Sequence, residues 1–347
     1  MSKNNQKIVL KETGAIGDLV IASAVIVSLQ KAGFKTGVIS KRFTLPLVEG
    51  ISPEEIGLYA DEKDVPINSF IIDISDYLKG LPHTRMLPPE YSGEERRLAH
   101  LCEWKAYTLF QKSGIKVHAS RDDVRIILGK DELAEGIERV YKISAENGHK
   151  PVVMLAPYST TINRNVSRST LEKVVEGISE FSVPCLLSPH LPEQYISGTI
   201  PLGDENLRKA AAILYAVDAC VVSDSGPLHI VNGIIQGEEL QGNSIITKEK
   251  SKVIAVLGSS HPTAVAYQGN NIIQPNKVCS IMPCGAHGYF SIEGYSDEFR
   301  TEFYGTGNEK DKSGCMFSDY SGKYSSKCME SIPAKEIVDK IREVLIK

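Results

Sequence analysis

Short apolar runs alternate along this chain with longer segments of helical character, and few residues separate one from the next. The apolar runs have the length and flanking residues of buried strands; they cover residues 7–10, 36–40, 69–75, 152–157, 184–188, 219–223 and 253–258. Helices are expected over residues 18–33, 92–113, 131–148, 168–181 and 205–216, and after Pro227. This alternation with short connections predicts an α/β fold of parallel sheets covered by helices.

The alternation runs in two cycles, and a length of 347 residues agrees with about two domains. We expect an N-terminal Rossmann-like unit over residues 1–125 and a C-terminal Rossmann-like unit over 126–330, with 331–347 as a closing amphipathic helix. The apolar stretch 124–128 is expected to bridge the halves. The polar stretch 236–250 is expected to form an inserted surface loop.

Composition excludes several classes of protein. With 42% hydrophobic and 24% charged residues the chain has a globular composition, which argues against a disordered or collagen-like protein. A net charge of -4 gives no general attraction to nucleic acids or anionic membranes. No stretch approaches the roughly 18 apolar residues of a membrane span, and the N-terminus lacks the features of a signal peptide. The odd count of 7 cysteines indicates reduced thiols, so we expect a cytoplasmic protein.

One turn with chemical potential follows the first strand, where Gly14 and Gly17 precede Asp18 at the start of a helix. Glycines let the backbone approach a ligand closely, and the free amides of a helix N-terminus favour negative charge. The spacing differs from the Gly-x-Gly-x-x-Gly fingerprint of dinucleotide binding. Asp18 has a second interpretation, as a first-turn carboxylate that complements the helix dipole.

A second turn follows the strand at 219–223, where Asp224-Ser225-Gly226-Pro227 precedes a helix that contains His229. Pro at the first helical position marks a helix start. The Ser225 hydroxyl and the amides of Ser225 and Gly226 are suited to hold a phosphate there. The alternative is an ordinary helix start, with Ser225 as its cap and His229 packed in the first turn.

Taken together, these turns and their flanking segments resemble glycosyltransferase family 9, the heptosyltransferase family. The matching blocks occur in the family's order; they are GAIGDLVIASAVIVSLQKAG, LAPYSTTINRNVSRSTL, NLRKAAAILYAVDACVVSDSGPLHIVNG and VIAVLGSSHPTAVAY. The third block, similar to the family's Asp-Thr-Gly-x-x-His run, is the most specific. The chain departs from the family where Arg164-Asn165-Val166-Ser167 replaces Lys-Arg-Trp-Pro, and where Pro227 enters the third block.

The resemblance implies a GT-B fold, in which two Rossmann-like domains face across a cleft and the C-terminal one binds most of the donor. It also implies an inverting, metal-independent transfer of a sugar from a nucleotide-diphosphate donor, ADP-heptose or related, to a surface-glycan acceptor such as a lipopolysaccharide core. A protein or a modified nucleobase is an alternative acceptor, although the acidic balance counts against nucleic acid. Two other functions stay open: a GT-B nucleotide-sugar epimerase and a nucleotide-binding protein without turnover.

Residue roles follow from the same resemblance. Asp18 matches the catalytic carboxylate, the expected general base, and Gly14 and Gly17 belong to its phosphate or acceptor loop. The expected donor-binding residues are Ser159, Thr160, Arg164, Glu193, Asp224, Ser225, Gly226 and His229. Among them Arg164 takes the place of a phosphate-binding Lys, and Glu193 is either a ribose contact or a solvated loop carboxylate.

Four cysteines gather in the segment 279–328: Cys279, Cys284, Cys315 and Cys328. Four thiolates match the ligand set of one tetrahedral metal, so a structural zinc or iron site is one interpretation. Members of the resembled family often carry cysteines ahead of a stretch like CMESIPAKEIV, and iron is expected in its protein-heptosylating branch. Free buried thiols are the alternative. No cofactor is expected to be needed for catalysis.

Overall fold

The computed structural model of the protein describes residues 7–52, 55–75, 86–87, 89–92, 97–159, 164–187, 195–204, 206–240, 250–276 and 326–346. Contacts divide the chain into two compact units. The first contains the described residues up to Lys130 together with residues 229–240. The second contains the residues from Asp131 to Leu228 and those from Lys250 onward.

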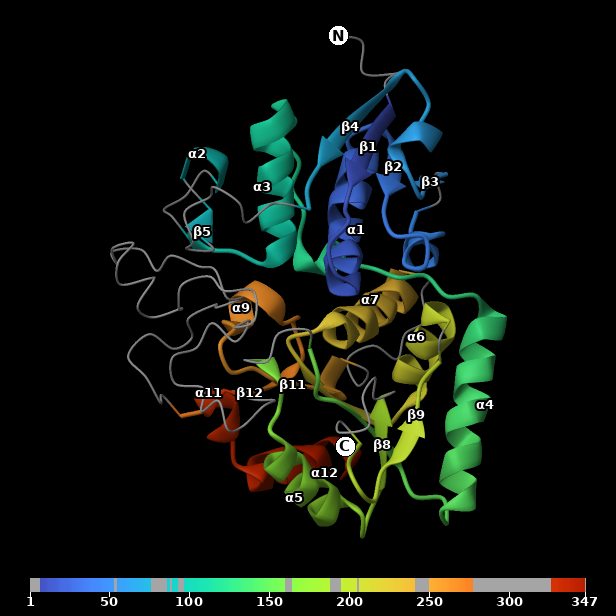
Figure 1. Ribbon diagram of the computed structural model, residues 1–347, viewed down its shortest axis with the longest axis vertical. Helices are drawn as coiled ribbons and strands as arrows, with labels where there is room; N and C mark the ends of the chain where they lie inside the picture. The colour runs from blue at the N-terminus through green and yellow to red at the C-terminus, as the bar shows by residue number, and fades with distance from the viewer. Residues whose placement is uncertain are drawn as a thin grey trace. The chain divides into compact units, whose positions relative to one another are not determined.

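The first unit is built on a parallel sheet with the strand order β3-β2-β1-β4, beside a short antiparallel pair, β5-β6 (Figure 1). Its elements are β1 (Lys7–Lys11), α1 (Ile16–Lys31), β2 (Lys35–Ile39), η2 (Leu45–Val48), β3 (Gly57–Tyr59), η3 (Glu62–Asp64), β4 (Ser69–Asp73), β5 (Met86–Leu87), α2 (Pro89–Ser92), β6 (Arg97–Leu98), α3 (Leu101–Ser113) and η4 (Arg121–Asp123). Every residue of α1 from Leu19 to Gln30 is buried, because its sequence is apolar nearly all round.

The second unit is built on a parallel sheet with the order β12-β11-β10-β7-β8-β9. The elements of this part of the chain are α4 (Lys130–Glu146), β7 (Val152–Ala156), α5 (Arg168–Ile178), β8 (Val183–Leu187), β9 (Ile200–Leu202), α6 (Leu207–Ala216), β10 (Ala219–Ser223), α7 (Gly226–Leu240), β11 (Val253–Val256), α9 (Pro262–Val265), β12 (Asn271–Ile273), α11 (Lys327–Glu330) and α12 (Ala334–Ile346). Of these, α7 belongs to the first unit from His229 onward. Helices α5 and α12 lie side by side and pack into one apolar core with the central strands (Figure 1).

The expected α/β class is confirmed, and so is each of the seven expected strands, to within two residues at either end. The central strands β7 and β10 are buried along their whole length, as parallel strands covered on both faces must be. The glycine expected to end the first helix does so, because Gly33 has φ +86 and its N–H donates to the Gln30 carbonyl. The closing helix is present as α12.

Two expectations need correction. The helix expected over 92–113 begins only at Leu101, where the His100 ring accepts from the Cys102 N–H and Glu103 accepts from the His100 N–H, a reciprocal cap. Residues 236–240 of the expected surface loop belong to α7 instead. The stretch 124–128, expected to bridge the halves, packs along α7, with the Ile126 N–H donating to the Gly233 carbonyl over 2.9 Å.

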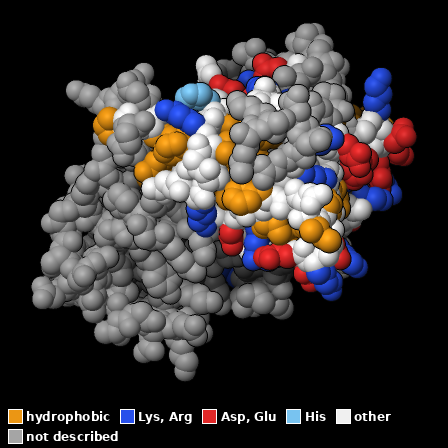
Figure 2. Space-filling model, turned by 90° about the horizontal axis from the view of Figure 1, so that it is seen from above, with side chains coloured by type: hydrophobic (Ala, Val, Ile, Leu, Met, Phe, Trp, Pro, Cys, Tyr) orange, Lys and Arg blue, Asp and Glu red, His pale blue; other side chains and the backbone are white. Residues whose placement is uncertain are grey.

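Three further strands, β3, β9 and β12, are of three residues each and had no distinct apolar signal. Short edge strands gain their stability from a neighbouring strand, so their own sequence marks them weakly. Figure 2 shows Lys and Arg side chains beside Asp and Glu side chains on the described part of one face, so both signs of charge are interspersed there. No described helix is both long and apolar enough to cross a membrane.

Candidate active site

In each parallel sheet the strand order reverses once, and the candidate residues follow the carboxyl ends of the strands at that reversal. In the first unit the reversal lies at β1, which has β2 on one side and β4 on the other. In the second it lies between β7 and β10. Loops leave in opposite directions at such a point and open a crevice, which is where α/β sheets bind ligands.

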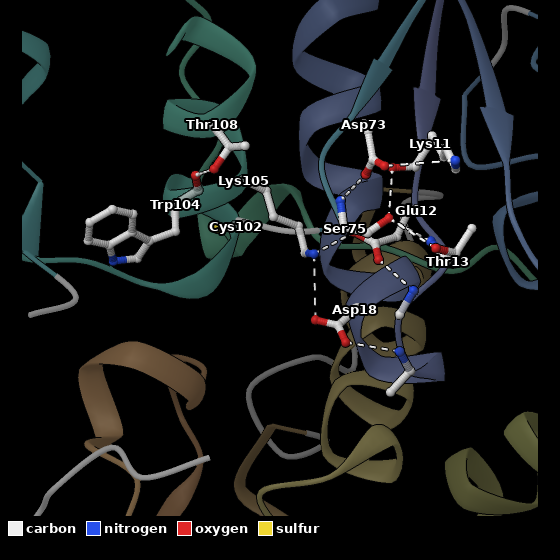
Figure 3. A network of polar contacts seen from close by, with 12 residues as sticks. Lys11, Glu12, Thr13, Asp18, Asp73, Ser75, Cys102, Trp104, Lys105 and Thr108 are labelled. Carbon is white, nitrogen blue, oxygen red and sulfur yellow. Dashed lines mark hydrogen bonds and ion pairs between the residues drawn. The ribbon is translucent and has the colours of Figure 1, made fainter. Parts of the chain in front are cut away.

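The turn after β1 carries a buried ion pair that meets the expected base (Figure 3). Lys105, from α3, donates from Nζ to Glu12 Oε2 over 2.6 Å, and the two side chains are 0% and 1% exposed. The same Nζ lies 3.5 Å from Asp18 Oδ1, whereas the Asp18 side chain is 25% exposed. Asp18 therefore has one oxygen toward a buried cation and enough exposure to meet a substrate.

Burial raises the pKa of the Glu12 carboxyl, the Lys105 ammonium lowers it, and the nearby Asp18 carboxylate raises it further, so that it lies above its ordinary value. Glu12 Oε1 also accepts from the Gly14 N–H over 2.9 Å. The pair thus fixes the backbone of the turn as well as the lysine.

The carboxylates of Glu12 and Asp18 lie so close to position 14 that a side chain there would clash with them, which explains the glycine. A Cβ at this position would lie 2.8 Å from Asp18 Oδ2 and 2.8 Å from Glu12 Oε1, closer than such atoms approach. The turn is held further by Ser75, after β4, whose hydroxyl accepts from the Thr13 N–H over 2.9 Å, and by Lys41, which donates to the Gly14 carbonyl. Gly17 is buried in the first turn of α1.

Asp18 also makes the contact expected of a first-turn carboxylate that complements the helix dipole, its second interpretation. It is the third residue of α1 and accepts from the Ala15 N–H over 3.0 Å, which places a carboxylate at the positive end of the helix. This contact uses Oδ2 and leaves Oδ1 to Lys105. The helix-capping contact and a role in catalysis are compatible, because they use different oxygens.

In the second unit Asp224 joins the loops that follow three adjacent strands. It comes after β10, is 3% exposed, and lies 3.5 Å from an Arg164 guanidinium nitrogen in the loop after β7. Its Oδ2 also accepts from the hydroxyl of Ser260, in the loop after β11. The ion pair limits where the Arg164 guanidinium can lie, and the expected donor contacts of Asp224 and Arg164 stay predictions.

The other expected donor residues that the structure describes lie in the loop after β7 and around the start of α7. Ser159 follows β7, and its N–H donates to the buried Asn165 side chain over 2.6 Å, which shapes the loop. Ser225 is buried, and its hydroxyl donates to the Ser223 carbonyl at the end of β10 over 3.3 Å. Gly226 begins α7, and His229 is buried in its first turn.

Five expected site residues lie outside the described residues: Thr160, Glu193, Cys279, Cys284 and Cys315. Cys328 is described: it is buried, and its sulfur lies 3.1 Å from the Ser326 hydroxyl. The metal prediction therefore stays a prediction. Burial raises the pKa of Cys185 and Cys220 to about 12, and that of Cys102 well above its usual range, so these thiols stay protonated and unreactive.

Sequence reasoning missed Glu12, Lys105 and Ser260. Glu12 had a usable signal, since it directly follows a buried parallel strand next to the glycine turn. Lys105 lies on α3 among buried apolar residues, and only its place on that face marks it as unusual. Ser260 is within the small polar segment that follows β11, which matched the family as a whole and not at this residue.

Neither a protein-family model nor a curated protein matches this sequence. Solved structures do match. A glycosyl transferase family 9 structure from Veillonella parvula DSM 2008 is 12% identical and has a TM-score of 0.59, over 100% of this chain and 99% of that one. The E. coli ADP-heptose LPS heptosyltransferase II is 12% identical over 98% of both chains, with a TM-score of 0.57.

A third match is the iron-containing dodecameric glycosyltransferase TibC from enterotoxigenic E. coli H10407, 12% identical over 99% of this chain and 80% of that one, with a TM-score of 0.56. TibC has also been solved with ADP-D-beta-D-heptose. At such identities the likeness concerns the fold. It confirms the resemblance expected from the sequence at that level: this chain has the two-unit α/β, GT-B fold of these heptosyltransferase structures.

Proposed function

We propose that the protein is an inverting glycosyltransferase that moves a sugar from a nucleotide-diphosphate donor, ADP-heptose or a related sugar, to a hydroxyl of a surface-glycan acceptor resembling a lipopolysaccharide core. The observation that carries the proposal is a fold likeness to a family 9 glycosyltransferase that spans 100% of this chain and 99% of the other. The donor sugar is proposed by analogy with TibC, which was solved with ADP-D-beta-D-heptose.

The chemistry asked of the first unit is proton removal. In an inverting transfer the acceptor oxygen bonds to the anomeric carbon as the bond from that carbon to the diphosphate oxygen breaks. The acceptor hydroxyl must lose its proton, and Asp18 is the proposed general base because its carboxylate is partly exposed and its position is fixed by Ala15 and Lys105. The Asp18 carboxylate becomes a carboxylic acid in this step.

The second unit is proposed to bind the donor and to stabilise the departing diphosphate. Arg164 supplies positive charge with two parallel N–H donors, and the Asp224 carboxylate limits where the guanidinium can lie. The amides of Ser225 and Gly226 at the start of α7 add neutral donors. These groups supply the charge that a divalent ion provides in other transferases, so we propose that transfer needs no added metal.

A structural metal is a separate matter. Cys328, the described member of the four-cysteine set, sits against the second unit's loop after β11, because a Cβ at Gly258 would lie 2.9 Å from its sulfur. Zinc or iron bound by the four thiolates would anchor this segment. Elemental analysis of the purified protein decides it: about one metal per chain, lost in the Cys328→Ser variant and kept in Cys102→Ser, supports the site.

The proposed function is tested by following ADP release and sugar transfer with ADP-heptose and a lipopolysaccharide-core acceptor, with and without a chelator. Asp18→Asn keeps the side-chain shape and removes the base, so we expect transfer to fall by about 10²-fold or more with donor binding retained. Asp122→Asn is the matched control on an exposed carboxylate of η4. Undiminished transfer by folded Asp18→Asn protein removes Asp18 from the base role. Donor conversion without any acceptor would favour an epimerase.

A further inference from the structure

The most unusual buried group among the described residues is Lys105, whose side chain is fully enclosed. Fully buried lysines are rare, because the ammonium loses its hydration, and an ion pair such as Lys105–Glu12 repays that loss only in part. Apolar side chains of similar size would stabilise this part of the first unit as well or better. The pair therefore calls for an explanation other than stability.

The contacts of Lys105 supply one (Figure 3). Its Nζ donates to Glu12 Oε2 and lies beside Asp18 Oδ1, so a single ammonium sits between a buried carboxylate and a partly exposed one. Asp18 Oδ2 is already engaged by the Ala15 N–H. Both oxygens of Asp18 thus have a donor on the protein side.

Resting on the function proposed above, we propose that Lys105 and Glu12 are positioning residues for the general base: Glu12 anchors the buried ammonium, and the ammonium holds the Asp18 carboxylate ionised and in a fixed orientation toward the acceptor. Neither residue needs to touch the substrate. Glu12 performs a second part of the task, because its other oxygen accepts from the Gly14 N–H and so ties the cation to the turn that carries Asp18.

The charged groups that face Asp18 in the described part of the unit set its proton affinity in opposite directions. The Lys105 ammonium, from α3, favours the ionised carboxylate, and Glu12, from the end of β1, opposes it. Lys41 belongs to the same surroundings through its contact with the Gly14 carbonyl. Removing Lys105 should therefore raise the titration midpoint of Asp18, whereas removing Glu12 should not, a difference that a general loss of structure would not produce.

The test follows the Asp18 carboxyl carbon by NMR in protein labelled with ¹³C-aspartate, with Asp18→Asn to assign the signal and no substrate present. Glu12→Gln removes one carboxylate from the ammonium and leaves Asp18 beside it, so we expect the titration midpoint of Asp18 at or below that of the wild type. Glu12→Gln/Lys105→Gln leaves no unpaired buried charge, and its midpoint should lie about one pH unit or more above that of Glu12→Gln. The control is Lys112→Gln, which replaces an exposed lysine on the same helix and should leave the titration midpoint of Asp18 unchanged.

Equal midpoints in Glu12→Gln and the double variant overturn the inference. So does a midpoint of Glu12→Gln above that of the wild type, an outcome that needs only the milder variant to fold. In the transfer assay the acid limb of kcat/KM should move with the NMR midpoint in each variant. If the limb stays in place while the NMR midpoint moves, the pair has no role in transfer. A wild-type protein that transfers no sugar overturns the proposed function instead, because the NMR titration does not depend on turnover.

Discussion

Asp224 is a buried carboxylate that contacts neighbouring loops, through the Arg164 guanidinium and the Ser260 hydroxyl. Three loops therefore depend on one side chain that comes directly after β10. Removing the carboxylate would leave the buried polar groups of its partners without a hydrogen-bond acceptor. The free-energy cost of such unsatisfied groups exceeds the net contribution of the original interaction.

We expect Asp224→Ala to lower the free energy of unfolding by about 3 kcal/mol, because the Ser260 hydroxyl and part of the Arg164 charge lose their buried partner. Urea denaturation followed by circular dichroism measures this. Glu172→Ala is the control, since it removes an exposed carboxylate that pairs with Arg168 on α5 and should cost about 0.5 kcal/mol or less. Equal losses in the two variants would show that Asp224 does not organise these loops.

Glu12 gives the stability of the protein a pH dependence whose sign follows from its pKa. Burial is the largest cause that raises this pKa above 4.5 in the folded state, so the folded protein holds the proton more tightly than the unfolded chain. Stabilisation from the protonated form is then present at low pH and is lost as the pH rises through the folded-state pKa.

We therefore expect the unfolding free energy of the wild type, relative to Glu12→Gln, to decrease as the pH rises from 4.5 through the folded-state pKa of Glu12. Urea denaturation of both proteins across this range gives the difference at each pH. The corresponding difference for Glu172→Gln, an exposed carboxylate, should stay flat. A wild-type advantage that grows with pH would mean that Lys105 outweighs burial at Glu12.

At the scale of elements, α7 shows why some of the fold lay beyond the sequence. Its start at Gly226-Pro227 was predictable from proline and glycine, whose backbone preferences are local. Its continuation past Gln236 was not, because polar residues suggested a loop and their burial depends on packing against the 124–128 stretch. Gly233 and Gly237, one turn apart, provide the flat face on which that stretch lies.

A side chain at Gly237 should disrupt this packing. A Cβ there would lie 2.1 Å from the Ile126 carbonyl oxygen, which is backbone and has little room to move. We expect Gly237→Ala to lower the unfolding free energy by about 2 kcal/mol, even though alanine gains about 1 kcal/mol in helix propensity. Glu239→Ala, an exposed position of the same helix, should be neutral or slightly stabilising. Thermal denaturation of the two variants compares them, and a stabilised Gly237→Ala would contradict the packing.

For the whole molecule, the two cycles of strands and helices predicted the α/β class and the central strands, because buried parallel strands and apolar helices carry strong local patterns. The candidate site was only partly predictable from the sequence. Asp18, Arg164 and Asp224 were expected from motifs, whereas Lys105 was not, because it reaches Asp18 from a helix 87 positions later in the chain. A partnership of that kind is set by tertiary packing and leaves no spacing to recognise.

Donor binding leads to a prediction for the whole molecule, because it changes the thermal stability of the protein. A ligand that binds only the folded protein stabilises it by about 2.7 kcal/mol at 100 times its Kd. For a chain of this length that corresponds to a rise in Tm of about 5 °C. In a panel of ADP-, UDP-, GDP- and CDP-sugars we expect the proposed donor, ADP-heptose, to produce the largest rise.

The rise in Tm should depend on Arg164, the cation proposed to bind the diphosphate. Arg164→Ala should lose most of the rise in Tm, whereas Arg168→Ala, which removes an exposed arginine on α5, should keep it. A larger rise with a UDP- or GDP-sugar would keep the fold-based proposal and reassign the donor. If none of the four sugars raises Tm in the wild type, the second unit is not a nucleotide-sugar site, and the transfer reaction falls with it.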